Sequence, residues 1–208
     1  MPTTTDDQTT ESRLLLAAER LFAEHGVDGV SLRAVMAEAG TNVASVHYYF
    51  GSKAGLLDAV VRSRIDTVAF GRDALVAKLG NNTSPRALAA AFIQPILDLV
   101  ESGAADWVAL IADLLRTNHP ALAPVSDGFF ERNSRFVELL RAADPSASTH
   151  AIGFRLIQAM TLTLGTLGGA ASLRAVLSRD GQSWTDDELR DELLNVVASI
   201  LAGPPQRP

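Results

Sequence analysis

The stretch over residues 31–53, SLRAVMAEAGTNVASVHYYFGSK, constrains the fold most, because it predicts two short helices joined by a tight turn. Ser31 can cap the first helix, since a serine hydroxyl accepts hydrogen bonds from the unpaired amides of a first turn. Apolar residues then recur at helical spacing, and Gly40 stands where a left-handed residue ends a helix. Asn42 is a second cap, so another short helix is expected to follow the turn.

This second helix is expected to expose small, polar and aromatic side chains on one face, while Val46 and Phe50 point inward. A helix of this kind fits the major groove of DNA, where side chains read base edges. Lys53, in the first turn of the next helix, is placed for a phosphate contact. The predicted DNA-contacting residues are Ser31, Arg33, Asn42, Val43, Ala44, Ser45, His47, Tyr48 and Lys53.

The segment AGTNVASVHYYFGSKAGLLDAVV resembles the signature of the tetracycline-repressor (TetR) family of regulators. That signature combines a turn glycine, a capped reader helix ending in aromatic residues, and a Gly-Ser-Lys that opens the next helix. The resemblance covers residues 11–62 and implies a homodimer joined by a four-helix interface. The chain departs from the family pattern at Gly55, where a glutamate usually completes a capping box with Ser52, so the next helix is expected to begin less firmly.

Composition favours a globular protein of the cytoplasm. The 208 residues are 47% hydrophobic and include no cysteine, which excludes disulfides and cysteine-based zinc sites. Residues 1–10 are polar and acidic, and we expect a disordered tail there rather than a signal peptide. The net charge is −6, but six acidic and six basic residues balance between Glu11 and Arg64, so the acid excess lies outside the segment expected to bind DNA.

Helical periodicity continues through the rest of the chain without a strand pattern. We therefore predict an all-α fold of about nine helices. A helix-turn-helix head occupies residues 11–51, a helical effector-binding and dimerisation domain occupies residues 52–203, and residues 204–208 form a tail. Pro95 is expected to kink or split its helix. Besides the two helices of the turn, the expected helices span residues 11–25, 52–79, 84–101, 106–117, 125–142, 145–178 and 185–202.

Several aromatic residues fall on helices that would surround a central cavity, where they could line a pocket for a small, largely apolar effector. Aromatic side chains at helical spacing equally form an ordinary core. Asp113 lies among apolar neighbours, and it either binds a ligand or pairs with Arg116 at i+3 on the surface. The candidate pocket residues are Phe70, Phe92, Trp107, Asp113, Phe129, Phe136, Phe154 and Gln158.

An uncharged run of 18 residues, LIQAMTLTLGTLGGAASL, lies between Arg155 and Arg174. Its length is at the lower limit for a membrane span, but its polar residues and glycines favour a buried helix. This run and the last helix are too apolar for a solvated face, so they either complete the core or join two copies of the chain. Small residues that would let two backbones approach at such a seam are Gly165, Gly168, Gly169, Ala170 and Ala171.

No hydrolase, P-loop, zinc-protease or dinucleotide motif is present, so we expect neither an enzyme nor a cofactor. The sequence predicts a ligand-responsive regulator of transcription that binds a palindromic DNA operator as a homodimer. Release of the operator by a small effector would make it a repressor. The alternative is a helical ligand-binding or adaptor protein whose head binds a protein partner; a steep loss of affinity with salt would identify DNA.

Overall fold

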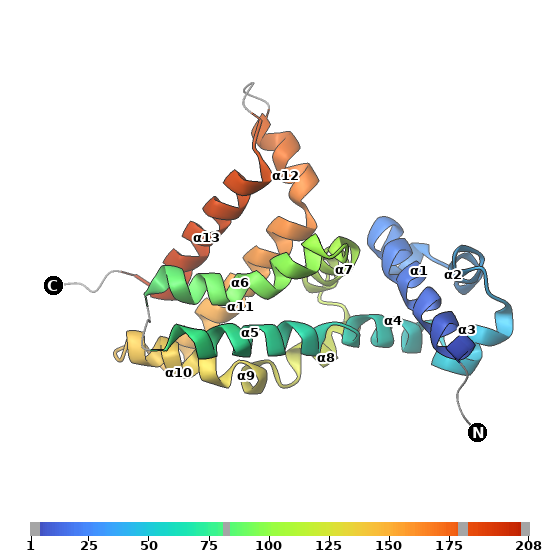
Figure 1. The fold of residues 1–208 in the computed structure, drawn as a ribbon, viewed down its shortest axis with the longest axis horizontal. Helices are drawn as coiled ribbons and strands as arrows, with labels where there is room; N and C mark the ends of the chain where they lie inside the picture. The colour runs from blue at the N-terminus through green and yellow to red at the C-terminus, as the bar shows by residue number, and fades with distance from the viewer. Residues whose placement is uncertain (1–4, 81–83, 179–182, 205–208) are drawn as a thin grey trace.

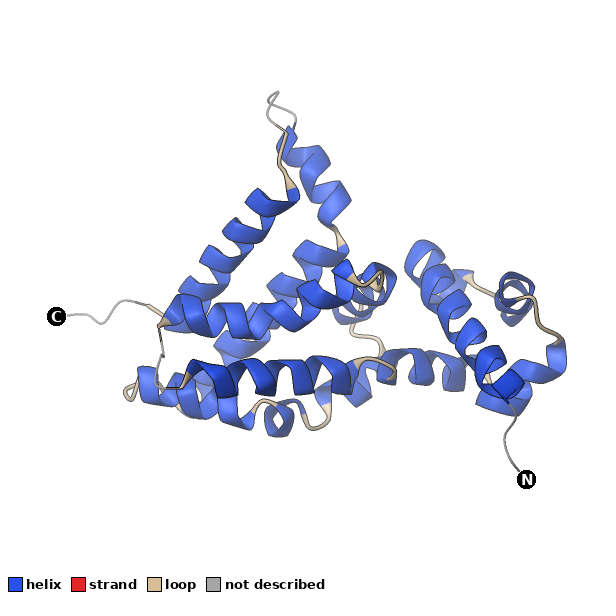
Figure 2. Ribbon diagram, in the orientation of Figure 1, coloured by secondary structure: helices blue, strands red, loops and turns tan. Residues whose placement is uncertain are grey.

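The computed structural model describes residues 5–80, 84–178 and 183–204, and for residues 5–9 and 43–45 it describes the backbone alone. Every regular element in the described part of the chain is a helix (Figure 2), which confirms the all-α prediction. The head lies at one end of an elongated molecule, and the remaining helices form the body (Figure 1).

The head consists of α1 (Thr5–Gly29), α2 (Leu32–Ala39) and α3 (Val43–Phe50), closed by α4 (Lys53–Arg62). Its apolar residues recur at helical spacing and meet in one core. α1 begins at Thr5, within the stretch expected to be a disordered tail; residues 1–4 lie outside the described part. Its helical geometry is interrupted at Gly26 (φ 71°, ψ 158°), close to the end that the sequence predicted.

A single helix over residues 52–79 was predicted, and this prediction is wrong. The chain forms α4 and then α5 (Ile65–Leu79), because Arg64 leaves helical geometry (φ −127°, ψ −1°). The carbonyl of Val60 is instead bound by two side chains: it accepts from the Ser63 hydroxyl (2.7 Å) and from the Trp107 indole Nε1 (2.9 Å). A tertiary contact thus supports the break, which apolar periodicity alone does not show.

The body is built around α6 (Pro85–Glu101), α7 (Ala105–Arg116), α11 (Thr149–Gly168) and α13 (Asp186–Ala202). α6 continues through Pro95 without being split. One apolar cluster joins the head to α6 and α7, so the body packs directly against the head. A second cluster, which includes Phe92, Phe136 and Val197, forms the core of the body.

Two further helices predicted from periodicity are divided. Residues 120–143 form the 3-10 helix η1 (Pro120–Leu122), α8 (Ala123–Ser126), α9 (Phe129–Arg132) and α10 (Ser134–Ala143), with Gly128 in the left-handed conformation (φ 72°). The helix expected over 145–178 begins at Thr149 and divides into α11 and α12 (Ala170–Leu177), which are bent by 79°.

The last helix was predicted correctly, and it begins with a capping box between Thr185 and Glu188. The turn expected at residues 181–182 lies outside the described residues. No single helix within the described ranges is long and apolar enough to cross a membrane; the bent pair α11 and α12 would pass on length and composition only when taken together.

Candidate nucleic-acid interface and buried cavity

Backbone capping fixes the turn between α2 and α3. Ser31 Oγ accepts from the amide of Ala34 (3.1 Å), and Gly40 is left-handed (φ 61°, ψ 39°), as the sequence predicted. The amide of Thr41 donates to the carbonyl of Met36 (2.9 Å), which completes a Schellman motif. These bonds satisfy the end of α2 and set the direction in which α3 leaves it.

Arg13 of α1 holds the same turn, although the sequence analysis did not single it out. Its Nε donates to the carbonyl of Ala39 (2.9 Å), and its Nη2 donates to the carbonyl of Gly40 (2.7 Å). Carbonyls at a helix C-terminus lack partners and carry partial negative charge, so a guanidinium is favourable there. Its first partner is 26 residues away in sequence, and no local pattern marks such a contact.

α3 turns one face to the core and another to solvent. Val46 is fully buried and Phe50 is half-buried, while Asn42 is exposed just before the helix. The side chains of residues 43–45 lie outside the described set, although the backbone there is helical and opens α3. The predicted contacts of Val43, Ala44 and Ser45 with DNA therefore remain predictions.

The exposed end of α3 carries two groups able to contact a ligand outside the protein. Tyr48 is 73% exposed, and its ring stands edge-on against Tyr49 at 4.9 Å between centroids. His47 is exposed, and its Nδ1 donates to the carbonyl of Gly51 (3.0 Å), which fixes the ring and leaves Nε2 for an outside partner.

Four of the six basic side chains between residues 11 and 64 are held within the protein. Arg13 binds carbonyls, and the other three form ion pairs: Arg20 with Glu24 and Glu38, Arg62 with Asp58, and Arg64 with Glu19. The remaining two are Arg33, exposed in the first turn of α2, and Lys53, half-buried at the start of α4. Neither has a hydrogen-bond or ion-pair partner among the described residues, so a positive charge is available on each of the helices that precede and follow α3.

Ser52 caps α4 without the carboxylate that family members usually have. Its Oγ accepts from the amide of Gly55 (3.1 Å). A Cβ atom at position 55 would lie 2.1 Å from the carbonyl oxygen of Phe50. The backbone path here therefore accepts glycine, and a side chain at this position would require the backbone to shift.

A buried ion pair lies beside the break between α4 and α5. Arg64 Nη2 is 3.1 Å from Glu19 Oε2, and Glu19 is only 5% exposed. Burial raises the pKa of Glu19 above its ordinary value, and the charge of Arg64 opposes that rise. Together with the Trp107 bond to Val60, this pair ties α1 and α7 to the same point of the chain.

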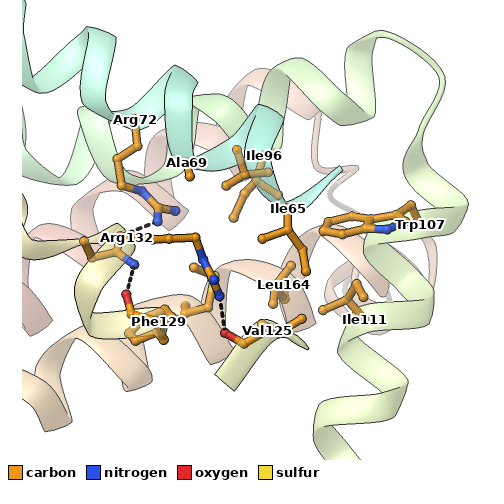
Figure 3. Close-up of a pocket in the computed structure, with 13 residues that line it drawn as sticks. Ile65, Ala69, Arg72, Ile96, Trp107, Ile111, Val125, Phe129, Arg132 and Leu164 are labelled. Carbon is orange, nitrogen blue, oxygen red and sulfur yellow. Dashed lines mark hydrogen bonds between the residues drawn. The ribbon is translucent and has the colours of Figure 1, made fainter. Parts of the chain in front are cut away.

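A cavity of about 50 Å³ opens next to this break, between α5, α6, α7, α8, α9 and α11. Figure 3 shows Trp107 and Ile111 at one end and Arg72 and Arg132 at the other. Apart from these two arginines and an asparagine, its lining is apolar. The lining residues are Ile65, Val68, Ala69, Arg72, Ile96, Trp107, Ile111, Val125, Phe129, Arg132, Asn133, Met160 and Leu164.

Of the eight candidate pocket residues, Trp107 and Phe129 line this cavity. Phe92 and Phe136 are buried in the body core, with ring centroids 5.2 Å apart. Phe70, Phe154 and Gln158 are exposed. Asp113 pairs with Arg116 (2.5 Å) on the surface, which confirms the second of its two predicted roles.

Arg72 is the functional candidate that the sequence analysis missed. It is 3% exposed, and its guanidinium lies over the ring of Phe92 at 4.1 Å. Its nitrogens donate to the Phe92 carbonyl (3.1 Å from Nη2) and to Asn133 Oδ1 (2.6 Å). Burial lowers the pKa of Arg72 to about 9, so the side chain is still charged at neutral pH. The signal in the sequence was an arginine within an apolar helical stripe.

No group of metal-binding side chains was found in the described part of the chain. The candidate functional features in the described residues are the exposed face around α3 and the cavity behind the break.

Comparison with known proteins agrees with this division. The family "Bacterial regulatory proteins, tetR family" matches residues 14–60, and the family "Tetracyclin repressor-like, C-terminal domain" matches residues 90–199. The second match alone covers more than half of the chain. No curated protein matches the chain.

Solved structures of low sequence identity share the fold. A Shewanella sp. PV-4 protein assigned to the tetR family of transcription regulators is 17% identical, with a TM-score of 0.63 over 90% of this chain and 95% of that one. The probable transcriptional regulatory protein RHA5900 is 21% identical, with a TM-score of 0.63 over 93% and 100%. A mutant of the protein HlyIIR is 18% identical, with a TM-score of 0.59 over 93% and 97%. With both family matches in their expected order along an all-helical fold, the chain belongs to the TetR family of DNA-binding transcription regulators, which are not enzymes.

Proposed function

We propose that this protein is a ligand-responsive repressor that binds a palindromic operator as a homodimer and works on DNA in the cytoplasm. The observation that carries this proposal is the placement of Arg33 and Lys53, whose charges have no partner among the described residues and flank α3. Phosphate contacts on both sides of a reader helix fix its register in the groove, while side chains of that helix read bases. Tyr48 and His47 are exposed on α3, the helix that lies between them in the chain.

Operator recognition can be tested without knowing the target gene. Selection from random duplex DNA is expected to recover a palindrome whose half-sites are about one helical turn, or a multiple of it, apart. Tyr48→Ala combined with Lys53→Ala should abolish binding to that duplex in a gel shift. Lys78→Ala is a matched control, because residue 78 is the other lysine of the chain and lies near the far end of α5.

Salt dependence separates DNA binding from a protein-binding head. Affinity for the duplex should fall steeply as salt rises, because each neutralised phosphate releases counterions. Lys53→Ala alone should lower the slope of log affinity against log salt by about 1. If the selection recovers no DNA motif and the affinity of the head for duplex DNA does not depend on salt, the result would instead support the adaptor alternative.

The exposed face of α11 supports the homodimer. Phe154 is 66% exposed and Ile157 is 44% exposed, and Thr161 and Gly165 continue the same stripe at helical spacing. Val196 of α13, 40% exposed, supplies a second apolar side chain. An apolar stripe of this kind on a globular protein is typical of an interface. We infer that α11 and α13 pair with their copies in a second protomer.

The glycines of α11 contribute to this interface unequally. A Cβ at Gly168 would lie 2.9 Å from Ala109 Cα of the same protomer, so this glycine serves packing against α7. A Cβ at Gly165 would meet nothing within 4 Å, so its open side is free for a partner. Because Ile157 lies on the exposed stripe of α11, Ile157→Glu would bury a charge in this interface and should give a monomer in sedimentation velocity. Phe70→Glu, at an apolar site on α5 that is even more exposed (71%), should leave the dimer intact.

The position of the cavity supports the ligand response. Trp107 lines the cavity with its ring while its indole N–H holds the carbonyl of Val60, the residue after which α4 begins to break from α5. A ligand that displaces Trp107 would therefore disturb the C-terminal end of α4. Lys53, a proposed phosphate contact, lies at the N-terminal end of the same helix. A ligand changes DNA affinity only by its differential affinity for the two conformations. A thermal-shift screen of apolar compounds, followed by gel shifts, tests the response.

A further inference from the structure

The cavity beside α5 is lined by two arginines, Arg72 and Arg132, that form no ion pair with a carboxylate among the described residues. Arg72 is buried and bonded to a carbonyl and an amide oxygen. Arg132, half-buried, donates to the carbonyls of Pro124 (3.0 Å) and Val125 (2.7 Å). Among the described residues, no acidic side chain forms an ion pair with either guanidinium. Oxygen atoms satisfy some of the donors, the Phe92 ring faces the guanidinium of Arg72, and the charge of Asp73 acts on Arg72 from a distance, but no carboxylate binds either guanidinium directly.

A purely structural role does not account well for this arrangement. Burying a charge without a counterion is costly, and apolar residues of similar volume are often as stable or more stable in such positions. Arg72 donates three hydrogen bonds to two oxygen atoms, and the bond from Nε to the Phe92 carbonyl is long (3.3 Å). A guanidinium has five N–H donors. Donors therefore remain for a further acceptor on the side of the cavity, where Figure 3 draws both guanidinium groups.

The opposite end of the cavity accepts only apolar groups. Ile65, Ile96, Ile111 and Leu164 form its walls, and the indole N–H of Trp107 is already used by Val60. A ligand that fits must therefore be charged at one end and apolar at the other. Guanidinium groups bind carboxylates through paired, charge-assisted hydrogen bonds, which gives both energy and orientation.

We propose that the effector is an apolar monocarboxylate, with its carboxylate bound by Arg72 and Arg132 and its apolar body directed towards Trp107. This inference rests on the proposed ligand response and adds the chemical class of the ligand. The cavity of about 50 Å³ holds few atoms, but a second hollow of about 220 Å³ lies across Val125, Phe129 and Met160, which border both. Displacing the short helices α8 and α9 would join the two spaces into one of about 270 Å³, just below the range of about 300–1,000 Å³ usual for small-ligand pockets.

The direct test compares ligands that differ only in the head group. Decanoate, decanamide and nonyl phosphate, each below its micelle concentration, are titrated into the full-length protein by calorimetry, with thermal shift as a second readout. Decanoate is expected to bind about 10- to 100-fold more tightly than decanamide, as expected for charge-assisted hydrogen bonds. Equal affinity of the acid and the amide would refute the inference, and so would preference for the phosphate over the carboxylate.

Variants then identify the residues that bind the carboxylate. Arg72→Met should weaken decanoate binding by about 10- to 100-fold and leave decanamide binding unchanged. Arg135→Met is the matched control, because Arg135 is an exposed arginine three residues after Arg132, and it should bind decanoate as the unmodified protein does. Unchanged decanoate affinity in Arg72→Met would overturn the assignment.

A second variant keeps the test open if Arg72→Met does not fold. Asn133→Asp places a carboxylate where Asn133 Oδ1 now accepts from Arg72 at 2.6 Å, so the protein itself would supply the counterion. Decanoate affinity should then fall at least about 10-fold, whereas undiminished affinity would contradict the proposal.

The proposed function and this inference fail in different ways. Binding of the ligand-free protein to its selected duplex reports on DNA recognition alone. If neutral apolar compounds bind and weaken the DNA complex as well as decanoate does, only the carboxylate assignment fails. If no compound of either charge binds or alters DNA affinity, the ligand response and the assignment both fail.

Discussion

The double acceptor at Val60 makes a quantitative prediction about the break between α4 and α5. Val60 is fully buried, and its carbonyl accepts from Ser63 Oγ (2.7 Å) and Trp107 Nε1 (2.9 Å). Removing either donor leaves one bond in place, so each single change should cost about 0.5–1.5 kcal/mol for the hydrogen bond. Trp107→Phe costs more in total, because it also removes part of a buried ring.

Removing both donors leaves the buried carbonyl without a partner. The desolvation penalty of such a group is about 1–3 kcal/mol. The double variant Ser63→Ala with Trp107→Phe should therefore be destabilised by about 0.5–1.5 kcal/mol more than the sum of the two single variants, which is the penalty less the second bond already counted. The packing loss at the ring appears in both arms of the cycle and cancels.

Urea unfolding followed by circular dichroism measures this coupling. Protein concentration must be the same for all four proteins, since the stability of a dimer depends on it. The slope of the free energy against urea should not change, which shows that the unfolded states are comparable. Ser199→Ala is the control, because Ser199 Oγ donates to the Asn195 carbonyl (3.0 Å) in α13, away from this break. Additivity within about 0.5 kcal/mol for Ser63 and Trp107 would refute the role given to Val60.

Three further changes test other parts of the fold. Gly168→Ala should lower the free energy of unfolding by about 1–3 kcal/mol, because its Cβ would lie 2.9 Å from Ala109 Cα, and chemical denaturation measures this. Thr185→Ala should cost about 1 kcal/mol by removing the cap of α13, seen as a lower melting temperature. The hydrogen bond from Ser146, and after it the one from Arg155, lower the pKa of Asp144. The contribution of Asp144 to the stability of the fold is therefore present above about pH 4 and is lost as pH falls through the folded-state pKa. Asp144→Asn should flatten the acid unfolding curve in that range.

The head could be predicted closely from the sequence because the residues that begin and end its helices act locally. Ser31, Gly40 and Ser52 act within three or four residues of their own positions, and the structure has each in its predicted capping role. Arg13 was missed because its partners lie across the helix pair. Capping chemistry is thus readable from a single segment, whereas the contacts that orient one segment against another are not.

The body was predicted less well because apolar periodicity continues across breaks. The pattern of residues 52–79 is uninterrupted, but Arg64 departs from helical geometry where Trp107 reaches the chain from α7. The other two divisions had local signals that were not used: Asp127-Gly128 is a turn dipeptide, and Gly168-Gly169 weakens a helix. Phe70 fits the apolar stripe but is 71% exposed, which shows that periodicity alone cannot tell a core residue from an exposed one.

The cavity could not be predicted from the aromatic residues, because charge and not aromaticity distinguishes it. Phe92 and Phe136 satisfy each other in the core, whereas Arg72 and Arg132 lie on helices about 60 residues apart and meet only in the folded chain. An arginine in an apolar stripe has two readings, a side chain that reaches solvent or a buried charge. Only tertiary structure decides between them.

The size of the ligand effect limits how the signal can travel from the cavity to the head. To raise the population of one of two conformations from about 1% to about 99%, a ligand must bind it more tightly than the other by about 5.5 kcal/mol. The hydrogen bond from Trp107 to Val60 is worth only about 1 kcal/mol, so breaking it cannot be the whole switch. The apolar cluster shared by α1, α4 and α7 and the buried pair of Glu19 with Arg64 join the same elements. We therefore expect a bound carboxylate to move α7 and the head together as one rigid unit. Trp107→Phe should then lower stability but reduce operator release by less than tenfold.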